Sequence, residues 1–257
     1  MEVNIKQIIK IYFICFYSCL FSQKIQFSIE NKTLEYTEND VNIQYIIKNN
    51  NKFPVFFVLN SNDFAIYNNH YDYYIDNRKV TFENNKDEKI FDPRIILVDR
   101  INKKDTIDII PTKNVLPDIK YLEDCNQKEK KIVEEEKKEI YNFQKKYFPN
   151  QDLIWNKRAK YVNENLHILL PMEELKVNTK VNLSSMIKNP ENCDLYNMGF
   201  NLEKKQYLFS IKMHNDINFI LKYLTKENKE NIKKINAKSL KEDFYSNTII
   251  LNIKEIR

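Results

Sequence analysis

Few side chains in this chain could do acid–base chemistry or bind a metal. Its histidines are His70, His167 and His214, and no two of them have the close spacing at which one helix or loop presents metal ligands. The sequence contains no His-Glu-x-x-His motif. Isolated histidines are more often surface residues or hydrogen-bonded core residues than ligands. The sequence therefore identifies no catalytic, metal-binding or cofactor-binding residue, and it gives no support for a Ser-His-Asp triad.

The cysteines indicate a structural role. Cys125 and Cys193 lie in the body of the chain, and neither has the Cys-x-x-Cys partner or nearby histidine that a redox motif or metal site would need. In an oxidising compartment, two such cysteines are most simply bonded to each other. We predict a Cys125–Cys193 disulfide; the alternative is a pair of free, buried thiols.

A group of tyrosines is the candidate for ligand contact. Tyr67, Tyr71, Tyr73 and Tyr74 are close in sequence, with aspartates between them. Flat aromatic faces beside carboxylates can bind sugar rings or peptides, through stacking and directional hydrogen bonds. The alternative is that these are ordinary strand residues, because tyrosine favours strands and the chain has 16 of them.

The composition excludes two classes of function. Gly199 is the only glycine in 257 residues, whereas phosphate-cradling loops need several close together. The net charge of +5 is modest and the basic residues are mixed with acidic ones, so we expect no nucleic-acid partner. Lys, Asn, Ile and Tyr have A·T-rich codons, and we interpret their abundance as genome bias.

The N-terminus predicts export. Lys6 and Lys10 precede an apolar run of about a dozen residues, too short for the ~20 of a membrane-spanning helix. We interpret residues 1–22 as a signal peptide, which gives a periplasmic, extracellular or lipid-anchored protein. No later segment is long and apolar enough to span a membrane.

A lipid anchor is the alternative to free release. Ser18-Cys19 has the small-residue-then-cysteine order of a lipobox, although Phe16 stands where leucine is usual. Lipidation at Cys19 would hold the mature chain on a membrane without spanning it.

Residues 23–117 are typical of β-strands. Apolar residues alternate with polar ones at residues 25–29 and 41–47, and residues 53–59 form a continuous apolar run. Asparagine pairs between the runs are plausible turns, because asparagine tolerates positive φ. Further strands are expected at residues 64–67, 71–75, 79–82, 95–98 and 106–110.

Residues 118–158 are predicted to form a helical insertion. Val133, Ile140, Phe143 and Tyr147 make one apolar stripe in a segment rich in Lys and Glu, and Pro149 ends the pattern. We expect the charged face to be solvated and the stripe to pack on the sheet. Residues 159–257 return to strands at 167–170, 177–183, 207–211 and 248–253, with a helix at 216–224.

Several segments carry a resemblance. Residues 169–174 (LLPMEE) run from a strand into a proline-centred turn, residues 207–211 form a Tyr-led strand, and residues 246–251 open a last strand with Ser-Asn. Together with residues 41–49, an early strand that ends in asparagines, they resemble exported bacterial proteins with an immunoglobulin-like β-sandwich. The usual glycine after Pro171 is missing.

The resemblance implies a mainly β fold, an immunoglobulin-like antiparallel β-sandwich with a helical insertion, and two separate β domains are the alternative. It implies no activity. The first hypothesis is a non-enzymatic binding or accessory module with a protein or glycan partner. The second is a lipid-anchored structural or assembly component of the envelope. The third is a hydrolase with a site between the sandwich and the helical insertion, which would need converging histidine and carboxylates.

Overall fold

The fold of this computed structural model is mainly β. Among the residues that the structure describes, more lie in strands than in helices, and several of the sheets are antiparallel. The structure describes residues 25–37, 40–61, 64–65, 73–75, 78–80, 91–103, 106–107, 109–114, 119–184, 196–240 and 243–254. The strands are β1 (Ile25–Ile29), β2 (Thr33–Tyr36), β3 (Val41–Asn49), β4 (Val55–Val58), β5 (Tyr73–Ile75), β6 (Arg78–Val80), β7 (Arg94–Asp99), β8 (Thr106–Ile107), β9 (Ile109–Asn114), β10 (Leu166–Leu169), β11 (Glu174–Val181), β12 (Tyr196–Phe200), β13 (Gln206–Met213), β14 (Lys238–Ser239), β15 (Phe244–Tyr245) and β16 (Ile249–Ile253). The helices are α2 (Ile119–Tyr147), α3 (Leu153–Glu164), α4 (Ile217–Tyr223) and α5 (Lys226–Lys234).

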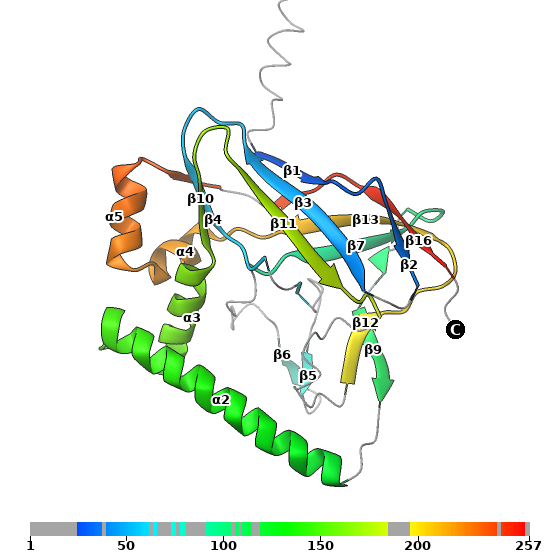
Figure 1. Cartoon of the computed structure of the whole chain (residues 1–257), viewed down its shortest axis with the longest axis horizontal. Helices are drawn as coiled ribbons and strands as arrows, with labels where there is room; N and C mark the ends of the chain where they lie inside the picture. The colour runs from blue at the N-terminus through cyan, green and yellow to red at the C-terminus, as the bar shows by residue number, and fades with distance from the viewer. Residues whose placement is uncertain are drawn as a thin grey trace, which may run out of the picture.

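Two sheets share the larger core. One has the order β1-β3-β11, and the other has the order β2-β16-β13-β7-β8, with β15 added beside β13. Strict alternation along β3 and β13 turns every second side chain inward, including Ile43, Tyr45, Phe209 and Ile211. Each sheet combines strands from before and after the long helix α2, so the two halves of the chain fold together (Figure 1).

Strand β4 is buried on both faces, which explains its continuous apolar sequence. Val55 and Phe57 belong to the core between the sheets, whereas Phe56 and Val58 belong to a second core under the helices. The strand pairs with β10 on one side and β14 on the other. A strand with two buried faces has no polar alternation, because neither face meets water.

The second core is largely helical and aromatic. Helix α3 contributes Ala159 and Val162, and α4 contributes Phe219, Ile220 and Tyr223. Side-chain caps start these helices: Asp152 accepts a hydrogen bond from the Trp155 backbone N–H, and Asp216 accepts one from Phe219. Asn163 of α3 then fixes the α4–α5 connection, because its amide oxygen accepts from the Thr225 N–H at 2.9 Å.

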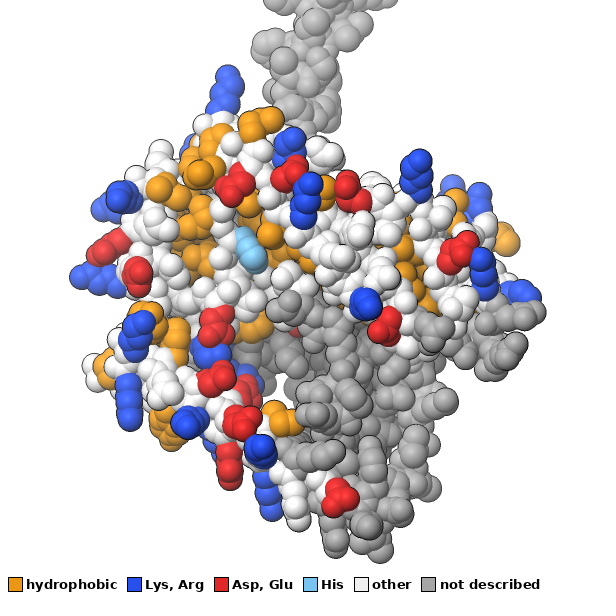
Figure 2. Space-filling view, in the orientation of Figure 1, with side chains coloured by type: hydrophobic (Ala, Val, Ile, Leu, Met, Phe, Trp, Pro, Cys, Tyr) orange, Lys and Arg blue, Asp and Glu red, His pale blue; other side chains and the backbone are white. Residues whose placement is uncertain are grey.

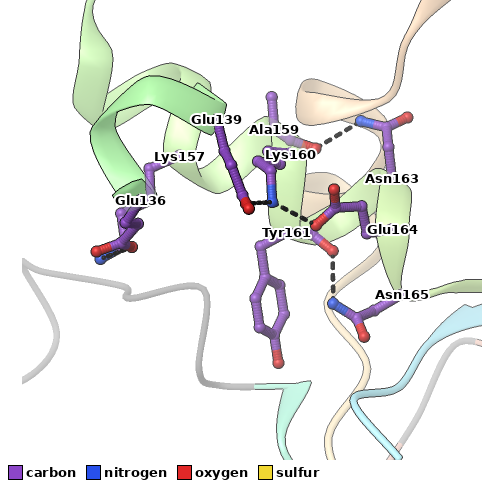
Figure 3. A network of polar contacts seen from close by, with 9 residues as sticks. All are labelled: Glu136, Glu139, Lys157, Ala159, Lys160, Tyr161, Asn163, Glu164 and Asn165. Carbon is purple, nitrogen blue, oxygen red and sulfur yellow. Dashed lines mark hydrogen bonds and ion pairs between the residues drawn. The ribbon is translucent and has the colours of Figure 1, made fainter. Parts of the chain in front are cut away.

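Helix α2 packs against α3, and Phe143 of its predicted apolar stripe packs against the second core, to which both β4 and the helices contribute. Glu136 and Glu139 of α2 form ion pairs with Lys157 and Lys160 of α3 at 2.9 and 3.0 Å. Figure 3 shows the Lys160 ammonium between the carboxylates of Glu139 and Glu164. Of the predicted stripe, Ile140 is buried, whereas Val133 is exposed. Both ion pairs are open to water, and such pairs add little stability.

The strands predicted from alternation at residues 25–29, 41–47, 95–98 and 207–211 are confirmed as parts of β1, β3, β7 and β13. The expected strand at 106–110 is divided into β8 and β9. Phe64 and Ala65, the described residues of the expected strand at 64–67, are buried but lie in no strand. The asparagine pairs at 68–69 and 84–85 lie outside the described residues.

Gly199 occupies a close contact between two backbones. It lies in β12, and a Cβ built on it would stand 2.3 Å from the carbonyl carbon and oxygen of Ser184. The Phe200 N–H donates to the Leu183 carbonyl at 2.7 Å, which holds the two segments together. Only a residue without a side chain fits here.

Candidate functional site

Most of the predicted contact residues lie where their side chains are not described. Tyr73 and Tyr74 belong to β5, which forms a hairpin with β6, while Tyr67 and Tyr71 lie outside the described residues. The tyrosine cluster therefore stays a prediction. In the described part of the chain, no helix is both long and apolar enough to cross a membrane.

The predicted disulfide and lipid anchor are also untested. Cys125 is a residue of helix α2, but the structure does not describe its side chain. Cys193 and Cys19 lie outside the described residues. Both modifications therefore stay predictions.

His167 has a structural role. Its Nε2 donates to the Leu59 carbonyl at 3.1 Å, and its ring stacks on Phe57 with 5.7 Å between centroids. Burial lowers the pKa of the imidazole, and the hydrogen bond to the Leu59 carbonyl only partly offsets this. A neutral, stacked histidine with its Nε2 bonded to a carbonyl joins β10 to the end of β4.

His214 lies in a charged cluster that we define as Arg94, Lys212, His214 and Asp243. Asp243 is its centre: one carboxylate oxygen is 2.6 Å from His214 Nδ1, and the other is 2.8 Å from Lys212 Nζ. Burial opposes ionisation of Asp243, but the hydrogen bond from Lys212 and the nearby His214 outweigh it and lower the pKa of its carboxyl.

Strand pairing explains why these groups meet. Lys212 of β13 lies directly opposite Arg94 of β7 and Tyr245 of β15. Two cations at opposed positions of a sheet repel each other, and Asp243, just before β15, supplies the anion between the strands. Lys212 Nζ also lies 5.6 Å from the centroid of the Tyr245 ring.

Arg94 links the cluster to a second carboxylate. Burial lowers the pKa of its guanidinium, while the charges of Asp243 and Asp92 raise it. Its Nε is buried without a hydrogen-bond partner among the described residues. Asp92 is 4% exposed and accepts hydrogen bonds from Asn60 and from the hydroxyl of Tyr161 on α3. The charges therefore extend from the sheet to the helical layer.

The cluster contains a carboxylate–imidazole pair, an arrangement that some hydrolytic sites also use. A carboxylate on Nδ1 fixes the orientation of an imidazole and leaves Nε2 able to exchange a proton. Phe91 lies beside the His214 ring, with 6.5 Å between centroids. Among the described residues, no serine, threonine or cysteine is hydrogen bonded to His214, and no group of three His, Cys, Asp or Glu side chains could hold a metal.

A second candidate site is an exposed loop that we call the apolar tip, defined as Leu170, Pro171 and Met172. Leu170 is 51% exposed and Met172 is 63% exposed. The Glu173 N–H donates to the Leu170 carbonyl at 3.1 Å, which closes a tight turn with proline at its second position. Met172 has φ 67°, the left-handed conformation that usually needs glycine. Met172 occupies the position after Pro171, where turns of this kind usually have a glycine.

Asn49 holds the apolar tip in place. This side chain is fully buried, and its amide nitrogen donates to the carbonyls of Phe53, Leu169 and Leu170 at 2.9, 3.0 and 3.1 Å. Its amide oxygen accepts from the backbone and the side chain of Asn51 at 2.9 Å each. This one asparagine thereby holds together the β3–β4 loop and the β10–β11 loop, which lie side by side (Figure 1).

The tip lies beside the start of β1. Ile25, the first residue of β1, pairs with Asn49, and the Met172 N–H donates to the Asn49 carbonyl at 2.7 Å. Figure 2 shows hydrophobic side chains at this end of the molecule. A rigid loop that exposes large apolar side chains is suited to binding another surface.

Sequence reasoning missed both sites for different reasons. His214 and Asp243 are 29 positions apart, and only the pairing of β13 with β15 brings them together. The tip carries a local signal, Leu-Pro-Met-Glu after a strand, which indicated the turn but not the exposure of its side chains. Compared with protein-family models, curated proteins and solved structures, the chain matches none of them significantly.

Proposed function

We propose that this chain is an exported, non-enzymatic binding or accessory module that docks on another component of the cell envelope through the apolar tip. The observation that carries the proposal is the exposure of Leu170 and Met172 on a loop whose backbone is held by the buried Asn49. Binding through a loop that is already ordered avoids much of the entropy cost of association.

The proposed fold of the module is an immunoglobulin-like sandwich. Two facing sheets around one core support it, as does the proline turn between β10 and β11. Such sandwiches carry many unrelated functions on their loops, so the proposed activity depends on the tip itself.

Site-specific crosslinking tests the docking proposal. A photoreactive amino acid replaces Leu170 in the full chain inside an envelope-bearing host, and Ile101, which is 92% exposed in the β7–β8 connection, is the control position. We expect crosslinks from position 170 to a protein or lipid, and none from position 101. Equal crosslinking from both positions, or none from 170, would contradict docking through the tip.

Export needs its own measurement, the intact mass of the protein in soluble and membrane fractions. A soluble chain that begins near Gln23 would support release after residues 1–22. A membrane-bound chain that begins at a lipidated Cys19 would support the alternative, an anchored envelope component. An unprocessed chain in the cytoplasm would contradict export. Alkylation before and after reduction shows whether Cys125 and Cys193 are bonded.

The His214–Asp243 pair favours a second candidate function, hydrolysis. The 2.6 Å contact gives His214 the orientation that a general base requires. A panel of ester, glycoside and peptide substrates would test it, with His214→Gln and Asp243→Asn as variants. Turnover that falls at least about a hundredfold in both variants would support an enzyme. Turnover that is absent, or unchanged in the variants, would reject it.

A further inference from the structure

The apolar tip has a left-handed backbone conformation at a residue whose side chain is largely exposed. Met172 is 63% exposed and has φ 67°. For a residue with a Cβ, this conformation is less favourable than a right-handed one, because the Cβ crowds the following carbonyl oxygen. Strained residues that persist in folded proteins cluster at binding and catalytic sites. An exposed methionine in such a turn points to contact with another surface.

The position of the tip limits what that surface is. β1 begins at Ile25, which pairs with Asn49, and Asn49 is bonded to the backbone of the tip. Cys19 is six residues before Ile25, and six residues span at most about 20 Å. If Cys19 carries a lipid, the end of the sheet that holds the tip stays close to the bilayer.

The charges beside the tip suit an anionic lipid surface. Lys52 and Lys238 are exposed, and Lys238 Nζ lies 4.2 Å from the centroid of the Phe53 ring. Of the neighbouring acids, Glu174 pairs with Lys176, whereas Glu173 accepts a hydrogen bond from a neutral donor, the Leu170 N–H. Lysines near a membrane surface are attracted to anionic headgroups.

We propose that the surface on which the tip docks is the lipid bilayer itself, in which Leu170 and Met172 enter the interfacial layer beside Lys52 and Lys238. The tip is then the second of two membrane contacts, and the first is a lipid on Cys19. A single acyl chain binds membranes weakly and reversibly, and stable attachment needs a second contact. This inference rests on the proposed docking function and, for the first contact, on the lipid-anchored alternative, because a chain that begins at Gln23 has lost Cys19.

The test uses flotation with vesicles, comparing 70% phosphatidylcholine and 30% phosphatidylglycerol with pure phosphatidylcholine. The binding variant is Leu170→Gln with Met172→Asn. Asparagine tolerates positive φ, so this variant loses apolar surface without losing the turn. The control is Ile101→Gln, which removes a more exposed apolar side chain from another loop. Thermal unfolding shows that each protein is folded.

The chain is prepared from the host envelope with Cys19 intact and as Cys19→Ser. We expect the binding variant to bind mixed vesicles at least about tenfold more weakly than the wild type in both forms, while the control binds as the wild type does. We also expect weaker binding to pure phosphatidylcholine, because Lys52 and Lys238 lose their anionic partners.

Equal binding by the wild type and the tip variant would overturn the inference, and so would equal losses in the variant and the control. If neither form binds vesicles but position 170 crosslinks to one protein in cells, the bilayer is the wrong surface and the proposed docking function stands. If position 170 crosslinks to nothing, the docking function fails as well.

Discussion

The two polar centres of the molecule, around Asn49 and around Asp243, join distant segments by different physical means. Asn49 is neutral and fully buried, and it uses both atoms of its amide to hold two neighbouring connections together. Asp243 is an acidic side chain that is partly open to water, and its two carboxylate oxygens contact Lys212 and His214. The first centre supports a loop that we propose as a binding surface, and the second joins three strands.

The two centres differ in how they respond to pH and salt. A buried network of neutral hydrogen bonds has no group that titrates, so it holds the same geometry at any ordinary pH. An ionic cluster depends on the protonation of each member and on salt. We therefore expect the apolar tip to be a fixed feature, and the charged cluster to be the adjustable one.

The largest expected effect is that of Asn49→Ala. Removing the amide takes one donor from the carbonyls of Phe53, Leu169 and Leu170 and one acceptor from Asn51, although the Leu170 carbonyl still accepts from the Glu173 N–H. Because each buried group without a partner costs about 1–3 kcal/mol, we expect a loss of about 3 kcal/mol or more in the free energy of unfolding. Urea denaturation measures it.

Two variants sharpen this prediction. Asn49→Asp retains the acceptor but places an oxygen against three carbonyls, so it should destabilise at least as much as Asn49→Ala. Asn31, a partly buried asparagine whose hydrogen bonds to backbone groups of β3 are exposed, is the matched control. Asn31→Ala should cost less than about 1 kcal/mol. Comparable losses at positions 31 and 49 would show that burial of the Asn49 amide does not matter.

The next effect in size is that of Asp243→Asn. The substitution leaves Lys212 and Arg94, which are directly opposed across the sheet, without the carboxylate between them. Because the pair is partly open to water, solvent screening limits the expected loss to about 1 kcal/mol. Adding Lys212→Met to the variant should restore part of the loss. No recovery in this double variant would show that repulsion between the cations is unimportant.

The third prediction concerns pH and separates the two centres. The folded-state pKa of Asp243 is below its ordinary 3.8, so its contribution to stability is complete above the unfolded pKa and is lost as pH falls through the folded pKa. The difference in stability between wild type and Asp243→Asn should shrink as pH falls below about 4. The difference for Asn49→Ala should not change. Urea denaturation at pH 7 and pH 3 gives both, and parallel curves would contradict the comparison.

The smallest effect is that of Met172→Asn, and it has the opposite sign. Asparagine adopts the left-handed conformation more readily than methionine does, so we expect a gain of about 0.5–1 kcal/mol. This corresponds to an increase of about 2 °C in Tm for a chain of this size. Leu170→Gln, in the same loop, should leave Tm nearly unchanged. A decrease in Tm for Met172→Asn would mean that the methionine side chain stabilises the fold through contacts.

The alternation of apolar and polar residues predicted the strands of the main core, because each of these strands has one face toward the core and one toward water. Strand β4 was recognisable for the opposite reason, since both of its faces are buried. Helix α5 could not be predicted in this way, because Ile232 is its only buried residue and a single apolar position has no period. Helix α3 extends past residue 158, the expected end of the helical insertion, and ends at Glu164.

The candidate sites were predicted less well than the strands. Pro171 predicted a turn, but the sequence could not show that Met172 takes the conformation usually left to glycine. Nothing local connects His214 with Asp243, since their contact depends on the register of β13 beside β15. The periodicity of a strand can be recognised from neighbouring residues. A site depends instead on how segments far apart in the chain pair with one another.

The contact between Gly199 and the Ser184 backbone has a consequence for how this sequence can change. A glycine codon that drifts toward A or T at its first or second base encodes a residue with a Cβ, and at this position that atom would overlap the Ser184 carbonyl. Met172 and Asn236 show that this chain forms left-handed turns without glycine. If the composition reflects a bias toward A and T in the gene, position 199 is a place where packing opposes that bias.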